Sequence, residues 1–312
     1  MAGEKEGVAI FGVFVADLAF WAGRLPEIGE TLVGSGFAMG PGGKGSNQSV
    51  AAARLGAKVT FITKVGADAF GDIALATWQR EGVIAQVTRS QTERTGAAFI
   101  YVNDKTGENA IIVATGAGGT LTPADVDMAA EAIRGARVFV TQLEQPVAAA
   151  RQGLAIAKAA GVSTVFNPAP ALRVADDVYP LCDYVVPNET EAAALTGVKL
   201  ASLDDARRAG DALLAKGAGT ALITLGEKGA LFHGYDRSIL VPAVNAGPVV
   251  ETTGAGDAFV GGFATALARG SDPVEATRFG CAVAGLSVTR AGTAPSMPTL
   301  AEVEALMARA SG

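Results

Sequence analysis

Short apolar runs alternate with longer segments of helical periodicity, and this alternation constrains the fold more than any other feature of the sequence. Apolar runs bounded by turn residues predict buried strands, and the periodic segments between them predict helices. We therefore expect a doubly wound α/β fold, in which helices cover both faces of a mostly parallel sheet. The predicted strands are 8–14, 58–65, 138–142, 163–167, 184–187 and 221–225. The predicted helices are 46–55, 72–81, 146–160, 190–196 and 204–216.

Polar residues follow several of the predicted strands at the point where each one ends. In doubly wound sheets, ligands bind beyond the carboxyl ends of the strands. These positions therefore predict a binding site along one edge of the sheet. They are Asp17, Glu144, Asn167, Asn188 and Thr224.

Two segments, 31–39 and 95–113, break the alternation and contain β-forming residues separated by turn residues. Residues 103–108 (NDKTGE) have the composition of a hairpin loop. We expect antiparallel strands outside the main sheet, which would form a small β lid from roughly 14–39 and 95–114. An edge hairpin of the main sheet is the alternative. The whole chain, with 49% hydrophobic residues, predicts a single large α/β domain over residues 1–312.

Composition excludes several classes of function. The formal net charge is −6 and no basic run is present, so binding to nucleic acid has no electrostatic support. Cys182 and Cys281 have neither metal-binding spacing nor a disulfide pattern, which suits a reducing cytosol. The charged segment Met1 to Gly7 precedes an apolar run too short for a signal peptide or a membrane span. We expect a soluble, cytoplasmic protein without a membrane partner.

Residues 251–257 (ETTGAGD) form a glycine-rich turn that leads directly into an apolar helical segment. Glycines let backbone amides converge, and a helix N-terminus carries partial positive charge, so this turn predicts an anion site. Asp257 is placed to remove a proton from a group that meets the anion. A helix N-cap is the alternative role for Asp257.

A second glycine-rich loop, residues 40–47 (GPGGKGSN), precedes another predicted helix. It lacks the strand and the acidic residue of a dinucleotide site, and Lys44 is followed by Gly45 rather than by the Ser or Thr of a P-loop. Backbone amides together with Lys44 and Asn47 suit a polyhydroxylated ligand. A structural turn that caps the helix is the alternative.

Together, the two loops resemble the two signatures of the PfkB (ribokinase-like) sugar kinases. The resemblance covers nearly the whole chain, includes 142–144 (QLE), 167–171 (NPAPA) and 187–191 (PNETE), and is greatest to ribokinases. It implies transfer of the γ-phosphate of ATP to a primary hydroxyl of a pentose, with D-ribose as the first candidate. Asp257 would be the base, and Gly254, Ala255 and Gly256 would supply the amides of the anion hole.

The resemblance also implies roles for other residues. Asn188 and Glu191 match the family's N-x-x-E motif and would organise Mg²⁺, largely through water. The implied sugar-binding residues are Val15, Asp17, Gly43, Lys44, Asn47, Glu144 and Asp257. The implied nucleotide-binding residues are Asn188, Thr224, Gly226, Gly229, Gly256 and Cys281, although packing is an alternative role for Cys281. The implied K⁺ site comprises Glu251, Thr253, Ser287, Arg290, Gly292 and Ser296.

Two residues depart from the family pattern. Val15 stands where ribokinases have Asn, which predicts relaxed or shifted selection at one sugar hydroxyl, in favour of 2-deoxyribose or another sugar. Glu251 replaces an Asp and reaches one methylene further, which predicts a K⁺ site of altered geometry. Fructose or a nucleoside is an alternative substrate, and a non-catalytic sugar or nucleotide sensor is an alternative function. Apolar lid strands also predict a homodimer that forms through the lid.

Overall fold

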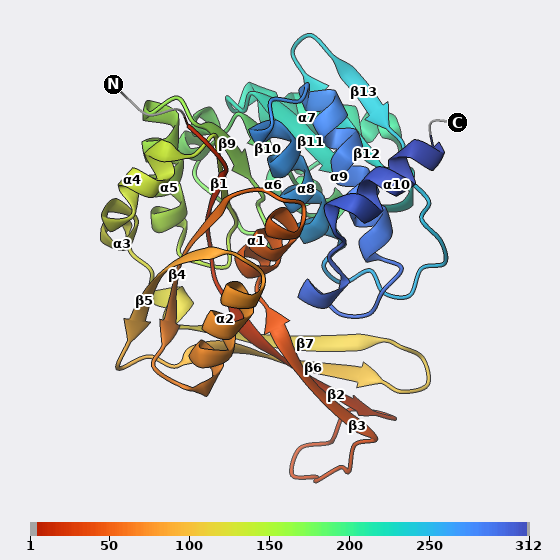
Figure 1. Ribbon diagram of the computed structural model, residues 1–312. Coiled ribbons are helices and arrows are strands. Elements are labelled where there is room, and N and C mark those ends of the chain that lie inside the picture. The colour runs from red at the N-terminus through yellow and green to blue at the C-terminus, as the bar shows by residue number, and fades with distance from the viewer. Residues whose placement is uncertain (1–4, 311–312) are drawn as a thin grey trace.

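A large sheet forms the centre of the molecule in the computed structural model, which describes residues 5–310 (Figure 1). Among the described residues, seven neighbouring strands of this sheet run parallel, and two further strands extend one end of it antiparallel. This confirms the mostly parallel sheet. Residues 1–4 and 311–312 of the expected domain 1–312 lie outside the described chain. Within the described part, the strand order is β13 (Ser238–Val241), β12 (Ala230–Gly234), β11 (Thr220–Thr224), β10 (Tyr184–Val185), β9 (Ser163–Phe166), β8 (Val138–Thr141), β1 (Val8–Phe11), β4 (Val59–Gly66) and β5 (Ile84–Ser90).

Helices cover both faces of this sheet, as expected (Figure 1). Residues of β1 alternate between two hydrophobic clusters because successive side chains of a strand point to opposite faces. The cluster that holds Ala9 and Phe11 includes residues of α3 (Pro123–Met128), α4 (Ala130–Gly135), α5 (Val147–Ala159), α6 (Glu189–Thr196) and α7 (Leu203–Ala215). The cluster that holds Val8 and Ile10 includes residues of α1 (Lys44–Arg54), α2 (Ala69–Arg80), α8 (Ala255–Ala268) and α9 (Pro273–Ser287).

A further cluster joins α10 (Leu300–Ala310) to α1 and α9 through Val303 and Leu306. No helix among residues 5–310 combines the length and the apolar character needed to cross a bilayer.

A separate, smaller sheet projects from the main body (Figure 1). Its strand order is β3 (Gly36–Gly42), β2 (Val15–Ala22), β6 (Thr95–Asn103) and β7 (Asn109–Gly116). The expectation of strands outside the main sheet is confirmed, and the edge-hairpin alternative is wrong. Residues 103–108 form the predicted hairpin loop, in which the Asn103 amide donates to the Glu108 carbonyl at 2.8 Å.

Two details of the strands differ from expectation, one in the small sheet and one at the end of β1. First, β2 and β6 pair in parallel rather than antiparallel, because β2 follows β1 and β6 follows β5, and both chains leave the same edge of the main sheet. Second, the predicted strand 8–14 is divided at Gly12. A Cβ on Gly12 would lie 2.3 Å from Gln142 Oε1 and 2.9 Å from Gly45 Cα, so the chain passes through a space that only glycine fits. β1 therefore ends at Phe11, and β2 begins at Val15.

Candidate active site

Asp257 lies in the first turn of α8, whose N-cap is Gly254 with a φ of 84°. That left-handed conformation is the reason a glycine is needed there. The Asp257 side chain is buried, and each carboxylate oxygen accepts an amide hydrogen from α1. Asn47 Nδ2 donates to Oδ2 at 3.1 Å, and Gln48 Nε2 donates to Oδ1 at 3.0 Å. Burial raises the pKa of Asp257, while the charge of Lys44 and these two hydrogen bonds oppose the rise.

Close packing of α1 against α8 brings these amides to the carboxylate. A Cβ on Gly261 of α8 would lie 2.6 Å from the Ala51 Cβ and 2.9 Å from the Gln48 carbonyl oxygen. The absence of a side chain at Gly261 therefore lets the two helices approach closely. This contact sets the distance between the Gln48 amide and Asp257.

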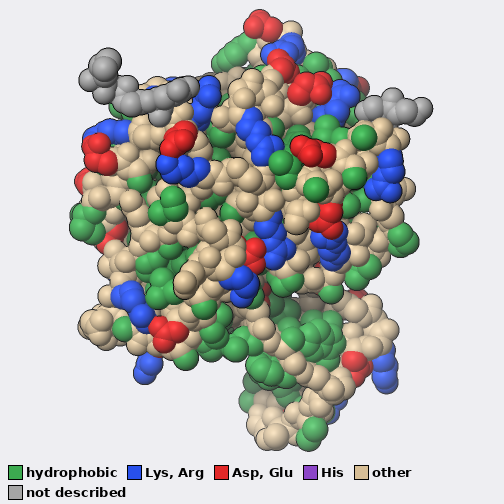
Figure 2. All heavy atoms as spheres, viewed as in Figure 1, with side chains coloured by type: hydrophobic (Ala, Val, Ile, Leu, Met, Phe, Trp, Pro, Cys, Tyr) green, Lys and Arg blue, Asp and Glu red, His purple; other side chains and the backbone are tan. Residues whose placement is uncertain are grey.

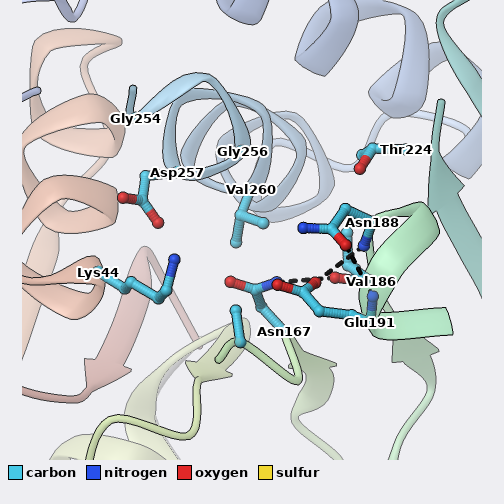
Figure 3. A pocket seen from close by; sticks show the side chains of 11 residues that line it. Lys44, Asn167, Val186, Asn188, Glu191, Thr224, Gly254, Gly256, Asp257 and Val260 are labelled. Atoms are coloured by element: carbon cyan, nitrogen blue, oxygen red, sulfur yellow. Dashed lines mark hydrogen bonds between the residues drawn. The ribbon is translucent and has the colours of Figure 1, made fainter. Parts of the chain in front are cut away.

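Lys44 begins α1 immediately after Gly43, whose φ is 88°. The Lys44 amide donates to Glu144 Oε2 at 2.7 Å, which joins α1 to the end of β8. Figure 3 shows the Lys44 ammonium directed toward Asp257. Burial opposes the positive charge, but attraction by Asp257, Glu144 and Glu191 exceeds this effect and raises the pKa of Lys44.

Asp17 lies in β2 of the small sheet, which the chain enters after the end of β1. Its carboxylate lies against Gly42 of β3, where a Cβ would come within 2.2 Å of Oδ1. Burial raises the pKa of Asp17 to about 6; a hydrogen bond with Thr293 lowers it, and repulsion by Asp257 and Glu251 adds to the rise. Burial likewise raises the pKa of Glu144 to about 7, against the opposing charge of Lys44.

A cavity of about 140 Å³ lies between α8, the start of α1 and the ends of β9 to β11 (Figure 3). Asn188 and Glu191 line it and form a capping box at the start of α6. The Glu191 amide donates to Asn188 Oδ1 at 2.8 Å, and the Asn188 amide donates to Glu191 Oε2 at 2.9 Å. The lining residues are Lys44, Asn167, Ala169, Val186, Asn188, Glu191, Thr224, Gly254, Gly256, Asp257 and Val260.

Comparison with known proteins identifies the family of this chain. Residues 5–300 match the pfkB family of carbohydrate kinases. The chain belongs to that family. It is 39% identical over 297 residues to a deoxyribokinase of Salmonella typhi, covering 94% of this chain and 96% of the relative. It is also 39% identical over 299 residues to a ribokinase of Haemophilus influenzae, covering 96% and 97%.

Solved structures agree with this assignment. Arabidopsis thaliana ribokinase, in complex with ribose and ATP, superposes with a TM-score of 0.90 at 29% identity, covering 97% of this chain and 99% of the other. A ribokinase of Thermotoga maritima superposes with a TM-score of 0.89 at 32% identity, with the same coverage. This pfkB kinase is therefore a ribokinase-like phosphotransferase that acts on an alcohol group of a carbohydrate.

One of the three amides predicted for the anion turn of this pfkB kinase already has an acceptor. The Ala255 amide donates to the Thr252 carbonyl at 3.2 Å. Among the described residues, the amides of Gly256 and Asp257 have no acceptor, as expected in the first turn of a helix. Gly256 also faces open space, because no heavy atom lies within 4 Å of an added Cβ.

The predicted nucleotide-binding residues of the kinase are only partly brought together. Thr224 lines the cavity and pairs with Asn188 in an isolated β-bridge. Gly226 is exposed in the turn after β11, and Gly229 has a φ of 103° and packs against the Val241 carbonyl. Cys281 packs inside the core, where burial raises its pKa to about 12, so its side chain does not reach the cavity. Packing is the role that these contacts support for Cys281.

The residues predicted for K⁺ lie around the loop that follows α9. Glu251 Oε2 accepts the Gly292 amide at 2.8 Å, and the Glu251 amide donates to the Val288 carbonyl at 3.2 Å. Arg290 is paired with Glu302 at 2.6 Å. Two predicted residues, Ser287 and Ser296, donate their hydroxyls to carbonyls of their own turns, and Thr253 is exposed.

Three polar residues near the site were missed by the sequence reasoning. Gln48 and Gln142 are fully buried, and Gln142 Nε2 donates to Gln48 Oε1. Thr293 Oγ1 donates to the Pro41 carbonyl at 3.1 Å and so joins the loop that follows α9 to β3. The available signal was the glutamine directly after Asn47, because the polar residues in this half of α1 are buried and therefore need partners.

Proposed function

We propose that this kinase transfers the γ-phosphate of ATP to the primary hydroxyl of a pentose, with D-ribose or 2-deoxyribose as the substrate. The observation that carries the proposal is the buried Asp257 carboxylate beside Lys44 at the amide-rich start of α8. The names of the related ribokinases and deoxyribokinase, and the ribose and ATP bound by the Arabidopsis thaliana enzyme, support the substrates.

The proposed reaction forms one bond and breaks another at the γ-phosphorus. The sugar oxygen bonds to phosphorus, the bond to the β–γ bridging oxygen breaks, and ADP leaves. Asp257 accepts the proton of the sugar hydroxyl, a role typically worth about 10²–10⁴-fold in rate. The amides of Gly256 and Asp257 and the Lys44 ammonium stabilise the negative charge of the phosphate in transfer.

Oxygen donors in the cavity fit Mg²⁺ bound mainly through water. The Glu191 carboxylate is buried at the cavity wall, where burial raises its pKa, and Asn188 and Asn167 add amide oxygens. No cluster of three or more His, Cys, Asp or Glu residues in the described chain could enclose a metal ion. A single carboxylate suits Mg²⁺, which keeps several waters and also binds phosphates. Mg²⁺ would neutralise phosphate charge.

The residues proposed to hold K⁺ fit that cation less fully than the cavity residues fit Mg²⁺. Glu251 supplies a carboxylate, but one of its oxygens is already bonded to the Gly292 amide. The cation would rely on the second oxygen and on carbonyls of the 287–296 loop. Because Thr293 joins this loop to β3 and to Asp17, K⁺ would order the sugar side of the site. We propose that K⁺ stimulates activity; equal rates in K⁺ and in a large organic cation would contradict this.

Val15 is the residue that we propose separates the candidate pentoses. It is buried and shares a face of β2 with Asp17, because residues two apart in a strand point to the same side. An apolar wall leaves a facing hydroxyl unpaired, at a cost of about 1–3 kcal/mol. Val15→Asn should therefore raise kcat/KM for ribose relative to 2-deoxyribose by about 10-fold or more. A strong ribose preference in the unmodified enzyme that survives the substitution would contradict this role.

The small sheet suits both a lid and a homodimer contact. Phe20, Phe37 and Phe99 are partly exposed on it, with ring centroids 4.9 Å and 5.7 Å from Phe20. Figure 2 shows hydrophobic side chains gathered over this part of the molecule. A second copy would cover them.

We place the enzyme in the cytoplasm, since Cys182 and Cys281 are both free and buried.

One assay tests the proposed function. ADP formation is measured with ribose, 2-deoxyribose, fructose and a nucleoside, for the unmodified enzyme and for Asp257→Asn. We expect sugar-dependent turnover that falls by about 10²–10⁴-fold in Asp257→Asn, and a thermal melt checks that this variant is folded. Absence of turnover with every substrate would favour a sensor that retains the fold.

A further inference from the structure

Gln48 uses both N–H groups and the oxygen of its side-chain amide in hydrogen bonds beneath Asp257. It lies in α1 with no exposed surface. Its Nε2 donates to Asp257 Oδ1 at 3.0 Å and to Asn167 Oδ1 at 3.1 Å, and its Oε1 accepts from Gln142 Nε2. Gln48 does not line the cavity, so a sugar or nucleotide bound there would meet Asp257 and not Gln48.

A backbone carbonyl fixes the direction of this chain of hydrogen bonds. Asn167 Nδ2 donates to the Val186 carbonyl at 2.8 Å, which can only accept. The Asn167 amide oxygen must therefore face Gln48, and Gln48 must present its NH₂ group. If the Gln48 amide flipped, its oxygen would face the oxygens of both Asp257 and Asn167. Gln142, also fully buried, then supplies the donor that the Gln48 oxygen requires.

We propose that Gln48 is a positioning residue that holds the Asp257 carboxylate in its reactive orientation and in its ionised form. This inference rests on the proposed function, because it assumes that Asp257 accepts a proton from the sugar. Asn47 differs from Gln48 in this respect. The buried Asn47 Oδ1 has no partner among the described residues, so only the donor group of the Asn47 side-chain amide is held in place.

The ionisation of Asp257 depends on charges from several elements packed around it. Lys44 of α1 favours the carboxylate. Asp17 of β2, Glu144 after β8 and Glu191 of α6 oppose it by repulsion. Gln48 provides a donor that stabilises the charged form without adding a charge. Loss of this donor should raise the pKa of Asp257, so the acid limb of the kcat profile should move to higher pH.

Gln48→Met tests the inference, because methionine has a similar length and no donor. We expect kcat to fall by about 10-fold or more at neutral pH, and the acid limb to move upward by about one pH unit or more. The KM values for sugar and ATP should stay close to those of the unmodified enzyme. The matched control is Gln145→Met, since Gln145 is also buried but donates to Thr141 and to the Gln142 carbonyl, away from Asp257. It should leave the acid limb in place.

Gln142→Met provides a second variant if Gln48→Met does not fold. It keeps the Gln48 donor but leaves the Gln48 oxygen without its partner, so the acid limb should move in the same direction by a smaller amount. An unmoved acid limb in a folded variant would overturn the inference, and so would a raised sugar KM with unchanged kcat. If the unmodified enzyme shows no sugar-dependent turnover, the proposed function fails and the inference falls with it.

Discussion

Gly42 offers a direct test of how the sugar side of the site is built. The Asp17 carboxylate lies so close to Gly42 that a Cβ would stand 2.2 Å from Oδ1 and 2.3 Å from Cγ. Gly42→Ala must therefore displace Asp17. If Asp17 binds sugar hydroxyls as proposed, its displacement removes hydrogen bonds to a charged group, which are worth about 1.5–3 kcal/mol. We expect the sugar KM to rise by about 10- to 100-fold, with little change in the KM for ATP.

Gly40→Ala is the matched control for this substitution. Gly40 lies in the same strand and pairs with Asp17 across β2 and β3, yet no heavy atom lies within 4 Å of the point where its Cβ would stand. Both variants lose the same backbone freedom, so their melting temperatures report any general effect on the strand. ADP release is measured against sugar concentration at about pH 8, above the Asp17 pKa of about 6. An unchanged sugar KM in Gly42→Ala would refute the contact between Asp17 and the sugar.

Three further predictions concern protonation, metal and assembly. The pKa of Glu144 is about 7 in the folded protein and 4.5 ordinarily, so Glu144 should favour folding below pH 4.5 and lose that contribution as pH rises toward 7. Thermal melts across this range should show less pH dependence in Glu144→Gln, and an equal dependence would contradict the assignment. Glu191→Gln should raise the Mg²⁺ concentration for half-maximal activity by about 10-fold or more, which a Mg²⁺ titration checks, with Glu189→Gln as the control. Ile112→Lys, on an exposed position of β7, should shift sedimentation toward a monomer, and an unshifted dimer would exclude this face.

The alternation of apolar runs predicted β1, β4, β8, β9, β10 and β11 of the main sheet, because buried strands and amphipathic helices have distinct periods. It did not predict β5, β12 or β13. It missed the break at Gly12, since the cause is contact with Gly45 and Gln142, which lie far away in sequence. It also missed the parallel pairing of β2 with β6, which depends on the edge at which each segment leaves the main sheet.

Candidate site residues inside the glycine motifs could be proposed from the sequence because their spacing is local. Gln48 could not, because its role depends on the face of α1 that meets α8, and the contact at Gly261 sets that face. The role of Cys281 illustrates the converse. Its position in a helix near the nucleotide motif suggested a ligand contact, whereas its side chain packs with the hydrophobic core.

The parallel pairing of β2 and β6 has a consequence for the order in which the chain matures. β2 and β3 can join as a hairpin early in synthesis, but the partner edge of β2 stays open until β6 has been made. Between them in sequence come α1, β4, α2 and β5. Until these elements assemble, an apolar strand edge that carries Phe20 remains unpaired, and such edges invite association with other chains. A nascent chain that ends before Thr95 is therefore the form of this protein most prone to aggregate.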